Sequence, residues 1–393
     1  MIFVEMLLCL LALATLVPVS VLTIQVLMAL PALRPRAMLV GRRPTVAIVI
    51  PAHNESLSIA STLRSIIPQT VAGDRVLVVA DNCSDDTARV AEAAGAEVLE
   101  RTDPDRRGKG YALDAGIRHI QDGPPEVVLI LDADCQIDDG GVAHLARLCL
   151  EKDQPVQGLD LMHSPRGGGL GLRIAEFAWL VKNHVRPLGF HRLNLPCHLM
   201  GTGMAFPWRI IANAPLASGH IVEDLKLGID LACAGKPALF CPEARITSYF
   251  PSAAAGIKSQ RTRWEHGHLG VILSDAPRLF LEAMRRRDAK LLALAFDLTV
   301  PPLALLALVV SAAFVGAAAL FAITGTELPI VLASMSTVLL SASVSIAWVR
   351  YGRQAVSFAG LCYSPIYALR KMPLYIGFIV RRQVGWVRSQ RDK

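Results

Sequence analysis

The stretch VVLILDAD, residues 127–134, decides the fold class of this 393-residue chain. Its first five residues are apolar, and the run ends abruptly at Asp132 and Asp134. Such a continuous apolar run is typical of a strand that is buried on both faces of a parallel sheet. Because ligands of such sheets bind at the carboxyl ends of the strands, we expect both aspartates to lie at a binding site.

Two upstream runs repeat this pattern. Residues 46–50 and 76–80 are short apolar runs, and helical patterns separate the runs from one another. The polar residues that follow the three runs are His53, Asn54, Glu55, Asp81, Asn82, Asp132 and Asp134. The segment 45–150 therefore predicts an α/β domain whose strand ends bring these side chains to one crevice.

The pair Asp132 and Asp134 has two interpretations. Carboxylate oxygens suit Mg²⁺ or Mn²⁺, which proteins often bind through one or two carboxylates together with substrate phosphates. The alternative is that one of these aspartates caps the N-terminus of a following helix.

A second acidic pair, Glu223-Asp224, precedes a helical pattern. Neighbouring helical residues point about 100° apart, so only one of the two can enter a site. A carboxylate there could act as a general base on an acceptor hydroxyl. It could also only complement the dipole of its helix.

Gln260, Arg263 and Trp264 lie at positions i, i+3 and i+4, which share one helix face. Arginine binds phosphate through two parallel hydrogen bonds, and tryptophan offers a flat face to a sugar ring. A solvated basic helix near a membrane would explain the arginines of this segment but not this grouping.

Membrane segments are predicted at both ends of the chain. Residues 1–33 are apolar apart from Glu5, are long enough to span a bilayer, and lack the basic start of a signal peptide. Residues 291–350 predict two further transmembrane helices, at 291–323 and 328–349, with Asp297 inside the first. Arginines flank these segments; those after the first span are Arg34, Arg36, Arg42 and Arg43.

The positions of these arginines predict a membrane topology through the positive-inside rule. It predicts an N-terminal anchor at 1–33, a cytoplasmic domain at 45–280, and an external loop at 324–329. Residues 354–393 are expected to form an interfacial or re-entrant segment with a basic cytoplasmic tail. Because the net charge of +7 gathers beside membrane segments, anionic lipid explains it better than nucleic acid does.

Residues 170–190 carry an amphipathic pattern in which Ile174, Phe177, Val181 and Val185 share one face. Such a helix could lie on the membrane, or it could be an ordinary helix packed on protein. The eight cysteines show no C-x-x-C spacing, so neither a zinc site nor a redox pair is indicated.

Six motifs in this order resemble the family 2 glycosyltransferases, and most closely the membrane-bound branch that contains cellulose and hyaluronan synthases. They are PAHNE at 51–55, DNCSDDT at 81–87, RGKGYAL at 107–113, DAD at 132–134, ED at 223–224 and QRTRW at 260–264. The resemblance covers about residues 45–275. It implies a GT-A fold flanked by transmembrane and interfacial helices, and an inverting reaction.

The resemblance also implies how a nucleotide-sugar donor, favoured as a UDP-sugar, would be held. Pro51 opens the first motif and is assigned to substrate binding. Glu55 and Asp81 would hold the base and the ribose. Lys109 would lie near the donor phosphates, and Asp132 would contact the nucleotide. The resemblance assigns Mg²⁺ or Mn²⁺ to Asp134, the remaining carboxylate of that motif.

For the later motifs, the resemblance makes Asp224 the general base and places Glu223 beside it at the substrate. Gln260 and Arg263 would hold the pyrophosphate, and Trp264 would line the acceptor site. Two departures leave the identity of the acceptor open. Residues 200–206, MGTGMAF, lack the cysteine of the synthases' F-x-C-G-[ST] motif, and valine replaces the threonine that precedes the acidic pair in cellulose synthases.

Three spans can hardly enclose a channel for a polymer, because such a pore needs a ring of protein to shield it from lipid. We therefore expect a multi-pass enzyme of the inner membrane that adds one sugar, or a few, to a lipid-linked acceptor in polysaccharide or glycolipid assembly. The alternative is a processive synthase that works as an oligomer or with a separate channel protein.

A sugar nucleotidyltransferase would need neither membrane helices nor the QRTRW motif, and two or three spans are few for a transporter. A membrane scaffold with an inactive transferase domain would be suggested by the loss of Asp134 or Asp224, and both are present.

Overall fold

The computed structural model describes residues 2–32, 42–219, 221–251 and 253–380. The expected basic tail at 381–393, and Arg34 and Arg36, lie outside these residues. The chain divides into two compact units. The described residues of the sheet unit lie within 42–163 and 196–267, and those of the helical unit lie within 2–32, 164–195 and 268–380.

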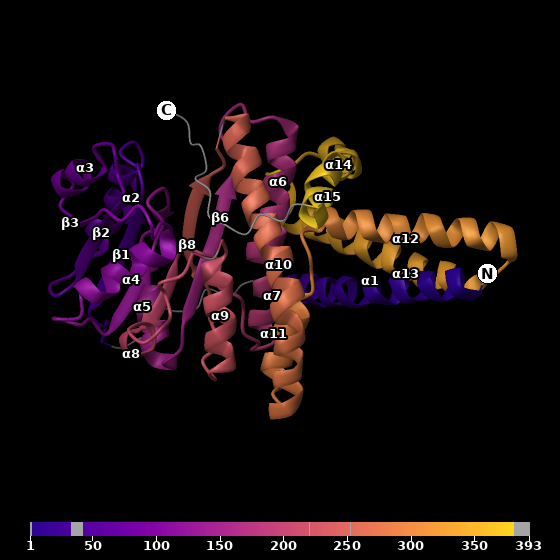
Figure 1. The fold of residues 1–393 in the computed structure, drawn as a ribbon, viewed down its shortest axis with the longest axis horizontal. Coiled ribbons are helices and arrows are strands. Elements are labelled where there is room, and N and C mark those ends of the chain that lie inside the picture. The colour runs from indigo at the N-terminus through magenta and orange to yellow at the C-terminus, as the bar shows by residue number, and fades with distance from the viewer. Residues whose placement is uncertain (1, 33–41, 220, 252, 381–393) are drawn as a thin grey trace. The chain divides into compact units, whose positions relative to one another are not determined.

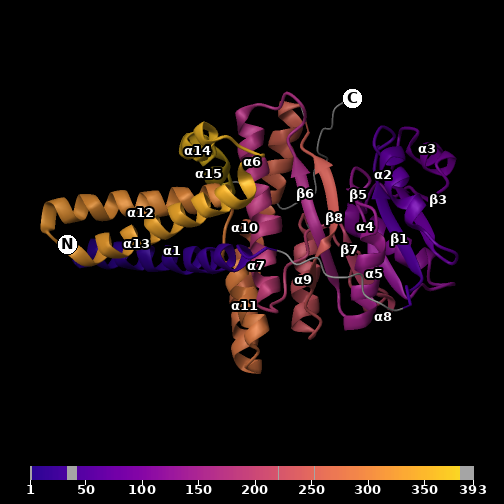
Figure 2. The same ribbon diagram turned by 180° about the vertical axis from the view of Figure 1, so that it is seen from behind.

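The described part of the sheet unit contains one sheet of eight strands in the order β3-β2-β1-β4-β7-β6-β8-β5 (Figures 1 and 2). The strands are β1 Val46–Ala52, β2 Arg75–Asp81, β3 Glu97–Arg101, β4 Val127–Ile130, β5 Gln136–Ile137, β6 Val156–His163, β7 Met204–Pro207 and β8 Leu239–Tyr249. The runs predicted at 46–50, 76–80 and 127–131 form β1, β2 and β4. These strands pair in parallel, β1 between β2 and β4.

Helices cover both faces of this parallel part, as continuous apolar strands require. The helices of the sheet unit are α2 Ile59–Ile66, α3 Thr87–Ala93, α4 Lys109–His119, α5 Gly141–Lys152, α8 Trp208–Ile211, α9 Glu223–Cys233 and the first part of α10 Ala254–Arg286, with a short 3₁₀ helix Ile67–Gln69. Ile48 and Ile50 belong to a buried cluster with side chains of α2, α3 and α5. Val49 points to the other face, where α4 approaches so closely that a methyl group at Gly116 would lie 2.9 Å from its Cγ1.

The antiparallel strand β7 brings a distant loop to the edge where the polar residues gather. It pairs with β4 so that Met204 lies opposite Ile130, and it also pairs with β6. Because β7 runs opposite to β4, it begins where β4 ends. The loop of residues 199–203, which leads into β7, therefore lies beside Asp132.

Three helices of the described helical unit are long and apolar enough to cross a membrane: α1 Ile2–Ala29, α12 Leu303–Thr324, and α13 with the π-helical turn that extends it, Glu327–Gly352. They pack along one another (Figures 1 and 2). Ala12, Ala317 and Ala333 form a buried cluster between them. Small residues at such contacts let helix backbones approach closely.

The first C-terminal span differs from the expectation of a helix over 291–323. Residues Ala289–Leu298 form a separate helix, α11, and the span itself begins at Leu303. The cause is Pro301-Pro302, because proline lacks a backbone N–H and disfavours helix in the residue before it. Asp297 consequently lies in α11 and not inside the span. The expected external loop at 324–329 is a short turn at Gly325–Thr326.

The amphipathic segment 170–190 forms α6 Leu170–Leu180, a π-helical turn Val181–Val185, and α7 Arg186–Arg192. Its predicted apolar face is buried within the helical unit, with Phe177 3% exposed. A methyl group at Gly352 would lie only 2.5 Å from the ring of Phe177. Protein therefore covers this face.

Residues 358–380 form two short helices, α14 Phe358–Arg370 and α15 Met372–Val380. At 13 and 9 residues, neither reaches the length of about 20 that a span requires. Their exposed apolar residues recur at helical spacing and are Phe358, Ile366, Leu369, Met372, Ile376, Ile379 and Val380. Tyr367 and Tyr375 are buried on the opposite faces.

Candidate active site

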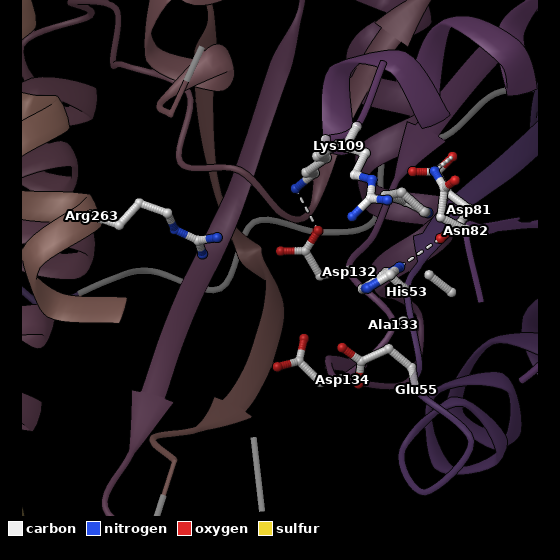
Figure 3. A pocket seen from close by; sticks show the side chains of 13 residues that line it. His53, Glu55, Asp81, Asn82, Lys109, Asp132, Ala133, Asp134 and Arg263 are labelled. Carbon is white, nitrogen blue, oxygen red and sulfur yellow. Dashed lines mark hydrogen bonds and ion pairs between the residues drawn. The ribbon is translucent and has the colours of Figure 1, made fainter. Parts of the chain in front are cut away.

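A pocket opens at the carboxyl ends of β1, β2 and β4, within the sheet unit (Figure 3). The empty space in it, with the open solvent at its mouth included, is about 700 Å³. Its lining residues are Pro51, Ala52, His53, Glu55, Asp81, Asn82, Arg107, Gly108, Lys109, Asp132, Ala133, Asp134 and Arg263. Of the seven polar residues expected to share one crevice, all but Asn54 line this pocket.

Two asparagines shape the loops that form one wall of the pocket. Asn54 and Asn82 adopt left-handed backbone conformations, with φ of 56° and 52°. Asparagine tolerates this region better than most residues do. The side chain of Asn54 accepts a hydrogen bond from the backbone N–H of Ser84 at 2.7 Å. The loops after β1 and β2 are therefore joined to each other.

Asp81 is almost fully buried at the end of β2, and its carboxylate already has partners. Oδ1 accepts hydrogen bonds from Arg101 Nη1 at 2.5 Å and from Asn82 Nδ2 at 3.0 Å. Its backbone carbonyl lies 2.7 Å from His53 Nδ1. Because a carbonyl can only accept, His53 carries a proton on Nδ1 and presents Nε2 elsewhere.

Lys109 is the first residue of α4, and Gly108 before it has a φ of 127°, a conformation that favours glycine. The Nζ of Lys109 forms an ion pair with Asp132 and donates a hydrogen bond to the carbonyl oxygen of Gly201 at 2.6 Å. Burial alone would lower the pKa of Lys109. Neighbouring carboxylates, with Asp132 foremost, outweigh burial and raise that pKa above its ordinary value. Lys109 therefore remains a cation.

The structure excludes the interpretation of Asp132 or Asp134 as a helix cap. No helix begins at either residue, because a turn and then β5 follow β4, and α5 starts later with Gly140 as its N-cap. Oxygens of the two carboxylates and the sulfur of Cys135 lie within 4.8 Å of one another. Burial, and then both aspartates, raise the pKa of Cys135 well above its ordinary value. The carboxylates form the donor set that suits a hard cation.

The second acidic pair opens α9, as expected, and faces the same lysine. Both Glu223 and Asp224 contribute to the raised pKa of Lys109. Burial, followed by the charge of Asp224, raises the pKa of Glu223 to about 7. A methyl group at Gly201 would lie 3.3 Å from Asp224 Oδ2. The acidic pair therefore lies next to the pocket although it is not part of its lining.

The three residues of the QRTRW motif do not share one environment. Arg263 lines the pocket and extends toward it from α10, as Figure 3 shows. Gln260 is buried, with 6% of its surface exposed, and Trp264 is partly buried. Neither of them lines this pocket. Of the helix face that these three residues were predicted to share, only Arg263 therefore lines the pocket.

Of the residues assigned by resemblance, seven line the pocket: Pro51, Glu55, Asp81, Lys109, Asp132, Asp134 and Arg263. The other lining residues, to which no role was assigned, are Ala52, His53, Asn82, Arg107, Gly108 and Ala133. Asn82 and Arg107 lie within quoted motifs, so their motifs were the available signal. Thr202, whose Oγ1 accepts the backbone N–H of Asp132 at 3.0 Å, lies in the segment 200–206 that was compared with the F-x-C-G-[ST] motif, but it was given no role there.

Residues 44–267 match the family described as Glycosyltransferase like family 2. This match covers more than half of the chain, which therefore belongs to that family and is a glycosyltransferase.

Among curated relatives, an uncharacterized glycosyltransferase of Mycobacterium bovis is 29% identical over 189 residues, which are 45% of this chain and 82% of that protein. A 4,4'-diaponeurosporenoate glycosyltransferase of Staphylococcus aureus is 44% identical over 75 residues, 18% of this chain and 20% of that protein. Among solved structures, the mannosyltransferase PcManGT of Pyrobaculum calidifontis, in complex with GDP-Man and Mn²⁺, matches with a TM-score of 0.56 and 16% identity. The match covers 96% of this chain and 100% of that one, and shows that the fold is shared.

Proposed function

We propose that this chain is an inverting, metal-dependent glycosyltransferase of the membrane-bound, synthase-like branch. It transfers a sugar from a nucleotide-sugar, with UDP-sugars as the first choice, to a lipid-linked acceptor at the membrane. The observation that carries the proposal is the composition of the pocket. Two cations, Lys109 and Arg263, share it with the carboxylates of Asp132 and Asp134.

This arrangement supports the binding of a nucleoside diphosphate. The buried carboxylate of Asp81 and the carboxylate of Glu55 stand at the strand ends where the base and ribose are expected. Lys109 and Arg263 supply positive charge for the two phosphates. Asp132 and Asp134 would hold Mg²⁺ or Mn²⁺, which supplies Lewis-acid stabilisation of the departing diphosphate. Gln260 is assigned to the pyrophosphate through the resemblance of the QRTRW motif to the family's.

The acidic pair supports the chemistry of a single displacement. Asp224 takes the proton of an acceptor hydroxyl as that oxygen attacks the anomeric carbon. The bond from this carbon to the diphosphate breaks on the opposite side, so the configuration inverts. Lys109 and Arg263 stabilise the negative charge that develops on the leaving group. Glu223 and Trp264 are assigned to the acceptor side of the site.

The helical unit supports an acceptor held at a membrane. Three helices are long enough to span a bilayer, and α14 and α15 each expose an apolar stripe. We propose that the spans lie in the inner membrane, that α14 and α15 lie at its cytoplasmic surface, and that the sheet unit is cytoplasmic. A lipid-linked sugar acceptor would then reach the active site without leaving the membrane.

The proposal is tested with the full chain in nanodiscs of bacterial polar lipid. A panel of nucleotide-sugars with Mn²⁺ or Mg²⁺ should release nucleoside diphosphate with one of them and yield a glycolipid larger by one sugar. Asp224→Asn should lower turnover by about 10²-fold or more, as the loss of a general base typically does. Near-normal turnover of this variant would remove Asp224 as the base, and a long polymer made without a partner would favour the processive alternative.

Cysteine labelling in intact cells tests the topology. The accessible native thiols are first replaced by serine. A single cysteine at Thr326, in the turn between α12 and α13, should react with an impermeant reagent. A cysteine at the exposed Gln121 of the sheet unit should not. The reverse pattern would overturn the proposed orientation.

A further inference from the structure

The side chain of Gln157 is fully buried, with none of its surface exposed, and lies in β6. Its amide crosses to the loop of residues 199–203. Nε2 donates hydrogen bonds to the carbonyl oxygen of Thr202 at 2.8 Å and to that of Gly158 at 2.9 Å. Oε1 accepts the backbone N–H of Met200 at 2.8 Å. One side chain thus satisfies backbone groups on both sides of Gly201.

The loop held in this way contacts three of the groups assigned to the reaction. The carbonyl of Gly201 accepts a hydrogen bond from Lys109, and its Cα lies against the carboxylate of Asp224. The hydroxyl of Thr202 accepts the backbone N–H of Asp132. The loop has no regular secondary structure, and Gly201 has a φ of 96°. The backbone N–H of Gly158 donates to the carbonyl oxygen of Gly203 at 2.8 Å, where β7 begins, and the Gln157 amide adds the contacts to Met200 and Thr202 on either side of Gly201.

We propose that Gln157 is a positioning residue, which fixes the loop of residues 199–203 so that Lys109, Asp132 and Asp224 keep their mutual arrangement. The inference rests on the proposed roles of these three residues. Gln157 itself does not line the pocket and does not touch a substrate there. Its effect is exerted through Met200, Gly201 and Thr202.

The test compares Gln157→Leu with a matched control, Gln69→Leu. Gln69 also uses its amide to bind several backbone groups, those of Ser65, Ile137, Asp138 and Val142. It lies in the 3₁₀ helix after α2 and makes no contact with the loop or the pocket. Both variants lose buried or half-buried amide hydrogen bonds, so both should lower the melting temperature.

Kinetics distinguish the two variants. Gln157→Leu should lower kcat for sugar transfer by about 10- to 10²-fold, because misplacing a reacting group by about 1 Å can cost that much. Its affinity for UDP or GDP with Mn²⁺ should fall less than kcat does, because the loop positions Lys109 and Asp132 while the rest of the lining comes from other loops. Gln69→Leu should leave kcat nearly unchanged.

Hydrogen exchange provides a readout that does not depend on turnover. The backbone amides of residues 199–203 should exchange faster in Gln157→Leu than in Gln69→Leu. Unchanged exchange in this segment, or equal slowing of transfer by both variants, would overturn the inference. If no nucleotide-sugar is turned over, or if Asp224→Asn stays active, the proposed function fails separately, and hydrogen exchange still decides whether Gln157 fixes the loop.

Discussion

Lys109 Nζ donates a hydrogen bond to the carbonyl oxygen of Gly201 at 2.6 Å, although the two residues are 92 positions apart in the chain. The open Cβ position of Gly201 faces both side chains, because a methyl group there would lie 3.3 Å from Asp224 Oδ2 and 3.8 Å from Lys109 Nζ. A lysine assigned to the donor and a carboxylate assigned to the acceptor therefore both approach a single glycine. The absence of a side chain at this position is part of the geometry of the site.

Alanine substitutions at Gly201 and at a control glycine should distinguish the effect of backbone strain on stability from the effect of the added methyl group on sugar transfer. Gly201→Ala puts a side chain at a φ of +96°, which costs on the order of 1–3 kcal/mol, and inserts a methyl group beside Asp224. Gly235→Ala, at a φ of +79° with no neighbouring atom within 4 Å, carries similar strain without the contact. Thermal unfolding should show similar losses of stability. Sugar transfer should fall by about tenfold or more only in Gly201→Ala, because the methyl group displaces the base; equal activities would contradict this role of Gly201.

Asp134→Asn should lower activity by about 10²-fold and raise the Mn²⁺ concentration needed for half-maximal turnover, because an amide is a weaker ligand than a carboxylate. Asp138→Asn is the control, since Asp138 follows four positions later and is exposed beside Arg245. Chelator should abolish wild-type turnover, and added Mn²⁺ or Mg²⁺ should restore it. Full activity in excess chelator would exclude the metal from the mechanism.

The raised pKa of Glu223 predicts how the free energy of unfolding depends on pH. Burial, and then Asp224, raise its pKa from an ordinary 4.5 to about 7 in the folded chain. Between these values the folded state binds a proton that the unfolded state releases, so the free energy of unfolding should fall as pH rises through this window. The loss should be roughly 2–3 kcal/mol.

Denaturant titrations at pH 4.5 to 7.5 measure this dependence. Glu223→Gln should flatten it, whereas Glu92→Gln, at an exposed position of α3, should leave it unchanged. A Glu223→Gln protein with the wild-type slope would show that another group is responsible.

The helical unit contains a buried ion pair that joins helices distant in the sequence. Arg186 Nη2 of α7 lies 2.6 Å from Asp297 Oδ1 of α11, and Gln25 Nε2 of α1 donates to the same oxygen at 2.6 Å. Arg186→Met or Asp297→Leu alone should destabilise the protein by about 3–5 kcal/mol, because each leaves a buried charge without its partner.

The double variant Arg186→Met with Asp297→Leu removes both charges, so it should recover much of that loss. Thermal unfolding in detergent micelles gives the interaction energy of the double-mutant cycle. Additive losses in the double variant would indicate that the ion pair does not hold these helices together.

Local patterns alone predicted a large part of this structure. The apolar runs at 46–50, 76–80 and 127–131 became β1, β2 and β4, because continuous apolar strands can be buried only inside a covered sheet. The break at Pro301-Pro302 was also readable from the sequence. The span was nevertheless expected to begin at 291, because the apolar pattern continues through the prolines.

By itself, the sequence determined the family, the α/β domain and the membrane-length helices, since motifs, periodicity and apolar length are properties of neighbouring residues. Only the tertiary structure decided that Gly201 lies against both Lys109 and Asp224, that Arg263 but not Trp264 lines the pocket, and that Gln157 holds the loop that contains Gly201. These relationships depend on the antiparallel pairing of β7 with β4 and β6. Such pairing joins segments far apart in the chain, and the register that sets it is fixed by packing across the whole sheet rather than by any local pattern.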